Sequence, residues 1–210
     1  MAWRYIMPGV FQGIPGEKQE KSEAELLVRL SNIPVATMKT HRFTTWHHRG
    51  DEAWWKSIEE YGKGNYKHPF VTLLGTVGTG KTHLALSLGW DWLERGKTVL
   101  YYHAADFLNA LRDGFRHTSE TDYSHTITFA KNCSLFILDD LGAERETEFA
   151  TEQLDLVVDY RYEHLRPLIV TTNQALDLLP PRVADRLQEG ALIHLKGESY
   201  RKKKHEALAG

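Results

Sequence analysis

A short stretch of the chain combines glycines with a lysine and a hydroxyl side chain. It is Gly75-Thr76-Val77-Gly78-Thr79-Gly80-Lys81-Thr82, followed by His83. The spacing fits G-x-x-x-x-G-K-[ST], in which glycines let successive backbone N–H groups point at one phosphate chain. Lys81 can then reach the β- and γ-phosphates, and the Thr82 hydroxyl can ligate Mg²⁺. The stretch predicts a nucleoside triphosphate site and not a chance glycine-rich turn.

Two carboxylates follow an apolar run later in the chain. Leu135-Phe136-Ile137-Leu138 leads directly into Asp139 and Asp140. An apolar strand that ends in acid at the carboxyl edge of a sheet commonly accompanies a phosphate loop, with the first acid as Mg²⁺ ligand. Asp140 is then placed to polarise the attacking water as a general base. The alternative is a pair of solvated acids that cap the next helix, but the phosphate loop favours the catalytic interpretation.

Three further polar residues follow later apolar segments. Asn173 comes after Leu168–Thr172 and can orient a water near the γ-phosphate, although asparagine is also a common turn residue at strand ends. Arg186 can project into a neighbouring subunit as an arginine finger, which predicts self-association, and Arg201 can return to the γ-phosphate of its own subunit. Each arginine can equally be a surface charge.

The elements that must position these residues alternate between strand and helix. Apolar runs predict strands at residues 70–74, 98–102, 135–138, 168–172 and 191–195. Helical periodicity lies between and before them, at residues 22–30, 51–61, 82–95, 104–131 (two pieces broken near 118–121), 146–164 and 182–188. This alternation predicts an α/β fold around a sheet of parallel strands.

Composition narrows the class of protein. The chain has 210 residues, a hydrophobic content of 41% and a net charge of −2, so any nucleic-acid binding must come from local patches. The single cysteine, Cys133, excludes an internal disulfide and is expected to be buried and inert. No apolar run approaches the roughly 20 residues of a membrane span, and no signal-peptide core is present. We therefore expect a cytoplasmic protein without a membrane partner.

Four motifs occur in the order seen in one family of nucleotide-binding proteins. They are the phosphate loop, Leu138-Asp139-Asp140-Leu141-Gly142, Val170-Thr171-Thr172-Asn173 and Ser199-Tyr200-Arg201. Over residues 30–203 the chain resembles the DnaC/DnaI/IstB group of AAA+ ATPases, and residues 105–115 resemble its helicase-loader members most. The resemblance implies a three-layer P-loop (ASCE) sandwich with a five-stranded parallel sheet that hydrolyses ATP with Mg²⁺. It also implies that Asn173 is sensor 1, Arg186 the arginine finger and Arg201 sensor 2.

The same resemblance implies that the two helices predicted at 104–131 are an insertion lining a channel for single-stranded DNA. The candidate DNA contacts are Arg112, Phe115, Arg116, Thr147 and Phe149, with further positive charge from Lys131. Arginine and lysine can pair with phosphates, and aromatic rings can stack on bases. The two phenylalanines can equally be ordinary helix-packing residues.

The chain departs from the family pattern at two places. Most AAA+ ATPases carry Glu at position 140, so the shorter Asp140 predicts slower hydrolysis. Only nine residues follow Arg201, so we expect no full C-terminal helical lid, with residues 33–43 covering the adenine instead. The expected organisation is an N-terminal tail and linker at 1–50, an AAA+ ATPase domain at 51–203 and a tail at 204–210.

Three functions remain open at this stage. The first hypothesis is an ATP-dependent loader that places a DnaB-like hexameric replicative helicase on single-stranded DNA. The second is an IstB-like helper that brings a transposase to target DNA with the same ATPase motifs. The third is an ATP-gated adaptor that barely hydrolyses.

Overall fold

The computed structural model describes residues 16–46, 52–116, 120–143, 145, 147–197 and 199–200. Its centre is a five-stranded sheet in the order β2-β3-β4-β1-β5, in which every neighbouring pair is parallel. The strands are β1 (Phe70–Leu74), β2 (Val99–His103), β3 (Leu135–Leu141), β4 (Leu168–Thr172) and β5 (Ala191–His194). The predicted five-stranded parallel sheet is confirmed.

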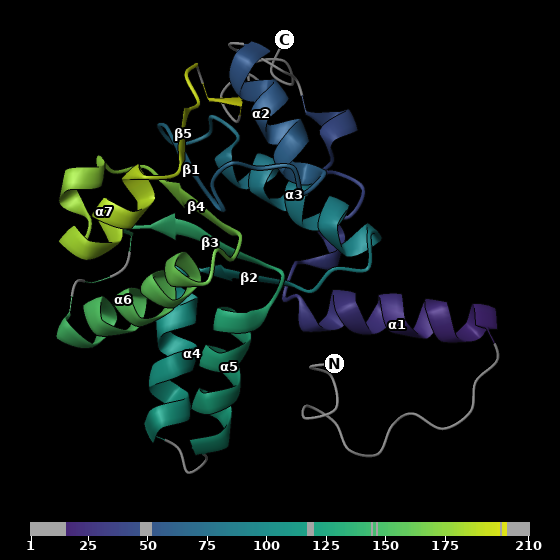
Figure 1. The fold of residues 1–210 in the computed structure, drawn as a ribbon, viewed down its shortest axis with the longest axis horizontal. Helices are drawn as coiled ribbons and strands as arrows, with labels where there is room; N and C mark the ends of the chain where they lie inside the picture. The colour runs from purple at the N-terminus through teal and green to yellow at the C-terminus, as the bar shows by residue number, and fades with distance from the viewer. Residues whose placement is uncertain are drawn as a thin grey trace, which may run out of the picture.

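Helices cover both faces of this sheet (Figure 1). They are α1 (Gly16–Leu30), α2 (Glu52–Gly62), α3 (Lys81–Glu94), α4 (Ala104–Arg116), α5 (Glu120–Asn132), α6 (Glu148–Glu163) and α7 (Pro181–Gln188), with 3-10 turns η2 (Val35–Thr37), η3 (Phe43–Thr45) and η4 (Leu176–Leu178). Among the described residues, none of these helices has the length and apolar character needed to cross a membrane.

Two hydrophobic cores form because successive strand residues point to opposite faces. Ile137 of β3 and Ile169 of β4 pack with α2 and α3 on one face. Phe136 and Val170, their chain neighbours, pack with α4, α5, α6 and α7 on the other. The result is a three-layer α/β sandwich, as expected.

Helices α4 and α5 form an antiparallel hairpin inserted between β2 and β3. Figure 1 shows the two helices side by side, extending away from the sheet. The helices end and resume at Arg116 and Glu120, close to the predicted break. The first helix of the pair begins at Ala104, directly after the last residue of β2, so the hairpin is joined to the sheet without a linker.

The segment after α1 is attached to the outer edge of the sheet. The backbone N–H of Tyr101 donates to Ser31 O at 2.8 Å, and Asn32 Nδ2 donates to Tyr101 O at 3.0 Å. Ile33 is almost fully buried against α3. The helix begins at Gly16, earlier than the predicted start at residue 22. The predicted start is late because residues 16–21 are polar or glycine and show no apolar spacing typical of a helix.

Candidate functional site

The phosphate loop connects β1 to α3, as predicted. Gly75, Gly78 and Gly80 all have positive φ angles, which glycine adopts without steric cost. Gly80 (φ 98°) immediately precedes the first turn of α3, so the loop ends at a helix N-terminus with its free N–H groups and positive partial charge. This local arrangement suits the binding of an anion such as a phosphate group.

Lys81 is buried within the loop. Its ammonium group donates to Gly75 O at 2.7 Å, to Thr76 O at 2.9 Å and to Asn173 Oδ1 at 2.5 Å. Burial lowers the pKa of Lys81, and the negative charges of Asp140 and Asp139 oppose that shift. The lysine is therefore held between its own loop and the end of β4.

The side chain of Thr82, in the first turn of α3, contacts the carboxylate of Asp139 on β3. The Thr82 hydroxyl lies 3.0 and 3.1 Å from the two carboxylate oxygens of Asp139, to which it donates. Asp139 is fully buried and also accepts a hydrogen bond from the hydroxyl of Thr171 at 2.6 Å. A hydroxyl and a carboxylate are hard oxygen donors of the kind that Mg²⁺ prefers, so the residues present fit this cation.

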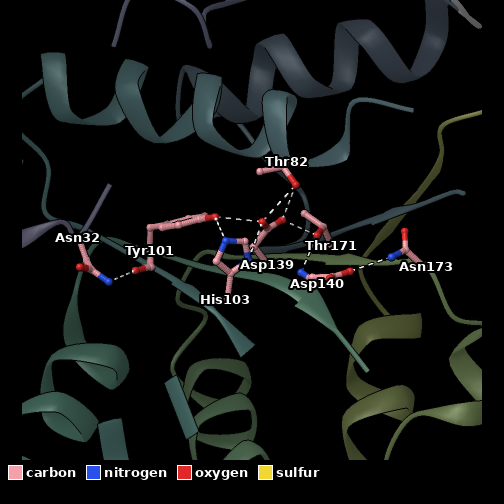
Figure 2. Close-up of polar contacts among 8 residues, drawn as sticks. All are labelled: Asn32, Thr82, Tyr101, His103, Asp139, Asp140, Thr171 and Asn173. Carbon is pink, nitrogen blue, oxygen red and sulfur yellow. Dashed lines mark hydrogen bonds and ion pairs between the residues drawn. The ribbon is translucent and has the colours of Figure 1, made fainter. Parts of the chain in front are cut away.

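Asp140 lies on an irregularity of the sheet. The pairing register between β3 and β4 shifts between Leu138 and Leu141, and Asp140 adopts a left-handed conformation with φ 58°. Its backbone N–H donates to Thr171 Oγ1 at 2.9 Å, and its carboxylate accepts from Asn173 Nδ2 at 2.8 Å (Figure 2). The bulge therefore turns the second acid toward Asn173.

These contacts bring together the residues that the sequence predicted as one site. Lys81, Thr82, Asp139 and Asn173 lie on β-strand ends or helix starts at the carboxyl edge of β1, β3 and β4. Asn173 contacts both Lys81 and Asp140, so its amide links the phosphate loop to the acids. The expected convergence of these side chains is observed.

His83, the residue after the loop and a candidate nucleotide contact, packs against an earlier segment of the chain. Its Nε2 lies 3.3 Å from both Arg42 O and Thr45 Oγ1, and its ring contacts those of His41 and Trp46. The ring of Trp46 also lies over Gly80, where an added Cβ would come within 2.5 Å of it. His83 thus joins α3 to residues 41–46, which cover the outside of the phosphate loop.

The segment after β5 also reaches the loop, where the ring of Tyr200 lies 6.5 Å from that of Trp46. The Tyr200 N–H donates to Gly78 O at 3.0 Å, and an added Cβ at Gly78 would clash with Ser199. The structure therefore places Ser199 and Tyr200 beside the loop, whereas Arg201 lies outside the described residues.

Arg186 belongs to a salt-bridge network on α6 and α7. Its Nε lies 3.2 Å from Asp159 Oδ1, its Nη1 lies 3.0 Å from Asp185 Oδ2, and its guanidinium covers the ring of Tyr162 at 4.4 Å. Arg182 binds the other oxygen of Asp159 at 2.7 Å. Within the described residues, the ion pairs of Arg186 are all with these two helices or with Glu189, and none is with the nucleotide site.

The side chains of three candidate DNA contacts, Arg112, Thr147 and Phe149, are described by the structure, and those of Phe115 and Arg116 are not. Arg112 on α4 donates to Asn109 and lies 5.3 Å from the ring of Phe149, which itself packs on the core. Thr147 caps α6 by accepting from Ala150 N at 3.1 Å. Phe115 and Arg116 lie in the last turn of α4, and their side chains are outside the described part. Lys131 lies elsewhere, over Tyr160.

Sequence reasoning missed three residues that contact the acids. They are Tyr101 and His103 on β2 and Thr171 on β4. Each lies within the last three residues of its strand, so their place at the carboxyl edge of the sheet was the available signal. Their polar side chains on otherwise apolar strands also set them apart.

Comparison with known proteins places this site in a family. The profile of IstB-like ATP binding proteins matches residues 64–208. The replicative helicase loader DnaC of Escherichia coli K12 is 33% identical over 133 residues, which cover 60% of this chain and 54% of that protein. The ATP-binding protein of insertion sequence IS5376 from Geobacillus stearothermophilus is 31% identical over 198 residues, covering 88% and 75%. The chain therefore spans about half the length of the DnaC relative.

Solved structures support the same fold. The crystal structure of the DnaC helicase loader matches with a TM-score of 0.65 at 23% identity, covering 76% of this chain and 98% of that one. AMPPCP-bound DnaA from Aquifex aeolicus matches with a TM-score of 0.67 at 21% identity, covering 81% and 56%. At these identities the likeness concerns the fold, which is that of the AAA+ ATPases. The chain belongs to the family of IstB-like ATP-binding proteins.

Proposed function

We propose that this protein is a cytoplasmic, DNA-dependent ATPase that loads a hexameric replicative helicase onto single-stranded DNA. The observation that carries the ATPase assignment is the contact of Lys81 with Asn173, beside the contact of Thr82 with Asp139. A phosphate-binding lysine, a water-orienting amide and two candidate Mg²⁺ ligands thereby lie together at one loop. The sequence identity to the DnaC loader supports the choice of helicase loading.

The residues of the site divide the work of hydrolysis between them. When ATP binds, Lys81 exchanges its carbonyl partners for the β- and γ-phosphates, and the N–H groups of the loop surround the phosphate chain. Thr82 and Asp139 would hold Mg²⁺, which supplies positive charge that stabilises the triphosphate. Asp140 takes the proton of the attacking water, and Asn173 orients that water. The hydrogen bond between Asn173 and Asp140 keeps the two groups in register.

Arginines complete the site in an oligomer. Arg186 reaches the γ-phosphate of a neighbouring subunit, and Arg201 reaches that of its own. To do so, Arg186 must release Asp159. The carboxylate and the phosphate are both anions and compete for the same planar set of guanidinium N–H donors. The chain is therefore expected to hydrolyse ATP faster once it self-associates.

The α4–α5 hairpin is the DNA-contacting element of this proposal. Arg112 and Arg116 pair with phosphates, and Phe115 stacks on a base. Phe149, in the first turn of α6, lies beside Arg112 and extends this surface, and Thr147 caps the same helix. ATP orders the hairpin and the subunit contact, and hydrolysis releases both.

A transposition helper is the second candidate. The relative from IS5376 covers 88% of this chain and 75% of its own length, a longer match than that of the DnaC loader. The same ATP site and hairpin serve this function, because only the protein partner differs. The third hypothesis, an adaptor that barely hydrolyses, requires no working arginine finger.

Phosphate release measured with and without single-stranded DNA tests these alternatives. We expect DNA to stimulate release, and Arg186→Ala to abolish the stimulated rate while nucleotide binding persists. Arg95→Ala, which removes an exposed arginine at the C-cap of α3, is the matched control. Equal and very slow rates with and without DNA, unaffected by Arg186→Ala, would contradict the DNA-dependent ATPase proposal and favour the adaptor.

Pull-downs with purified proteins identify the partner. The tagged chain, loaded with a non-hydrolysable ATP analogue, is mixed with a DnaB-type hexameric helicase or with an integrase-type transposase. We expect capture of the helicase only. Capture of the transposase alone would replace helicase loading with transposition as the function.

A further inference from the structure

The buried carboxylate of Asp139 is held from β2 as well as from the nucleotide site. Tyr101 donates its phenolic O–H to Oδ2 at 3.0 Å, and His103 Nδ1 lies 3.3 Å from the same oxygen (Figure 2). Oδ1 accepts from Thr171 on β4 at 2.6 Å. Donors from two neighbouring strands therefore fix the plane of the carboxylate, while Thr82 approaches it from the phosphate loop.

Tyr101 and His103 also contact each other. The Tyr101 hydroxyl lies 3.2 Å from His103 Nε2, and the two rings meet edge to face at 5.5 Å. Residues i and i+2 of a strand share one face, which is why both side chains reach the same acid. The three groups form a closed triangle of polar contacts around Oδ2 of Asp139. Burial, with Asp139 as the next cause, raises the pKa of Tyr101, so the phenol remains a hydrogen-bond donor.

His103 occupies the junction between the sheet and the hairpin. It is the last residue of β2, it pairs in register with Asp139, and Ala104 begins α4. Ala104 is fully buried, whereas the side chain of His103 is 51% exposed. The polar contacts to Asp139 and Tyr101, more than packing, therefore orient the imidazole. Tyr101 is fixed on its other side by the backbone contacts with Ser31 and Asn32.

We propose that Tyr101 and His103 are positioning residues that orient Asp139 for a divalent cation, and that His103 transmits movements of the α4–α5 hairpin to this carboxylate. This inference rests on the proposed ATP site and, for the second part, on DNA binding by the hairpin. Groups that hydrogen-bond to a metal ligand commonly change metal affinity by about 10- to 100-fold when removed. Because α4 follows His103 directly, a movement of the hairpin when DNA binds would also move His103 and, through their contact, the Asp139 carboxylate.

Binding of Mn²⁺ in place of Mg²⁺, followed by electron paramagnetic resonance, measures the first part without turnover. The protein is saturated with a non-hydrolysable ATP analogue and titrated with Mn²⁺. We expect His103→Ala to weaken Mn²⁺ binding by about tenfold, and Tyr101→Phe to weaken it by a similar factor. His103→Asn should restore most of the affinity, because its amide N–H can donate where Nδ1 does.

Two controls separate positioning from a general loss of structure. His68→Ala removes an exposed histidine far along the chain from β2 and should leave Mn²⁺ affinity unchanged. Binding of the analogue without metal should be the same in His103→Ala and the wild type. A wild-type Mn²⁺ affinity in His103→Ala, or its loss in His103→Asn to the same extent as in His103→Ala, would overturn the positioning role.

The second part is tested by repeating the titration with single-stranded DNA. We expect DNA to tighten Mn²⁺ binding in the wild type and in His103→Asn, and to have no effect in His103→Ala. A DNA effect that survives in His103→Ala, or is missing from the wild type, would overturn transmission through this residue. Lys81→Ala distinguishes the two levels, because analogue binding that survives it contradicts the ATP site itself and not the role of His103.

Discussion

Lys81 Nζ donates a hydrogen bond to Asn173 Oδ1, which joins the start of α3 to the end of β4. The other two N–H groups of the ammonium bind carbonyl oxygens of the phosphate loop, at Gly75 and Thr76. A lysine ammonium has three donors, so the protein uses all of them in this state. In the proposed mechanism, phosphate oxygens of ATP replace these partners of Lys81, and Asn173 is then free to bind a water.

Asn173→Ala separates binding from hydrolysis. The substitution removes an acceptor of Lys81 and a donor to Asp140, but it leaves the loop carbonyls and the N–H groups of α3 in place. We expect kcat to fall on the order of 10²-fold, as for the loss of a group that acts in the transition state, while ATP affinity changes less than about threefold. Single-turnover hydrolysis and equilibrium binding measure the two effects. A loss of affinity equal to the loss in kcat would assign Asn173 to phosphate binding instead.

Asp140→Asn tests the general base with little change to the backbone. Asp140 has φ 58°, a left-handed conformation that asparagine adopts more readily than most residues. Only the charge is therefore removed, and we expect hydrolysis to slow by roughly 10²- to 10⁴-fold with ATP binding retained. Asp177→Asn, at an exposed acid of η4, is the control. Unchanged hydrolysis in Asp140→Asn would exclude Asp140 as the base.

Arg161 stabilises the junction of α5, β3 and β4. It is fully buried, and its guanidinium donates to Ala130 O at 2.6 Å, to Cys133 O at 3.1 Å and to Pro167 O. Arg161→Met removes these donors and takes their charged partner from the buried carbonyls of Ala130 and Cys133, so we expect the free energy of unfolding to fall by about 3–5 kcal/mol. Arg95→Met, which removes only an exposed helical ion pair, should cost about 0.5 kcal/mol or less. Urea denaturation compares the two, and similar midpoints would contradict the structural role of Arg161.

Cys133 provides a chemical measure of unfolding. The residue is 2% exposed, and burial raises the pKa of its thiol, with the nearby Arg161 opposing the shift. A raised pKa lowers the fraction of reactive thiolate at neutral pH, so native protein should react with Ellman's reagent only as fast as it opens. We expect negligible labelling in buffer and complete labelling in denaturing urea. Rapid labelling of the native protein would show that this part of the core is open.

The central strands and the phosphate loop were predictable because their signals are local. The bounds of β1 and β4 agree with the prediction residue for residue, since both strands are buried on both faces and consist of short apolar runs. The loop follows from glycine, lysine and threonine at fixed spacing. Asp139 could be placed because it directly follows such a run.

Other features depend on contacts between distant segments. β3 continues through Asp140 because Thr171, on another strand, accepts from the Asp140 backbone. His83 contacts Arg42 and Thr45, about forty positions earlier in the chain, so its motif neighbours gave no sign of that orientation. The network of Tyr101, His103 and Asp139 requires the register of β2 with β3, which the sequence does not specify.

The ATP site itself is tested most directly by equilibrium binding of ATP to Lys81→Ala and to Lys97→Ala. Lys97 is an exposed lysine beyond the C-terminal end of α3, so its removal controls for the loss of one positive charge. We predict that Lys81→Ala weakens ATP binding on the order of 10²-fold, as expected for about 3 kcal/mol of charge-assisted hydrogen bonding, and that Lys97→Ala binds like the wild type. Wild-type affinity in Lys81→Ala would contradict the assignment of this site.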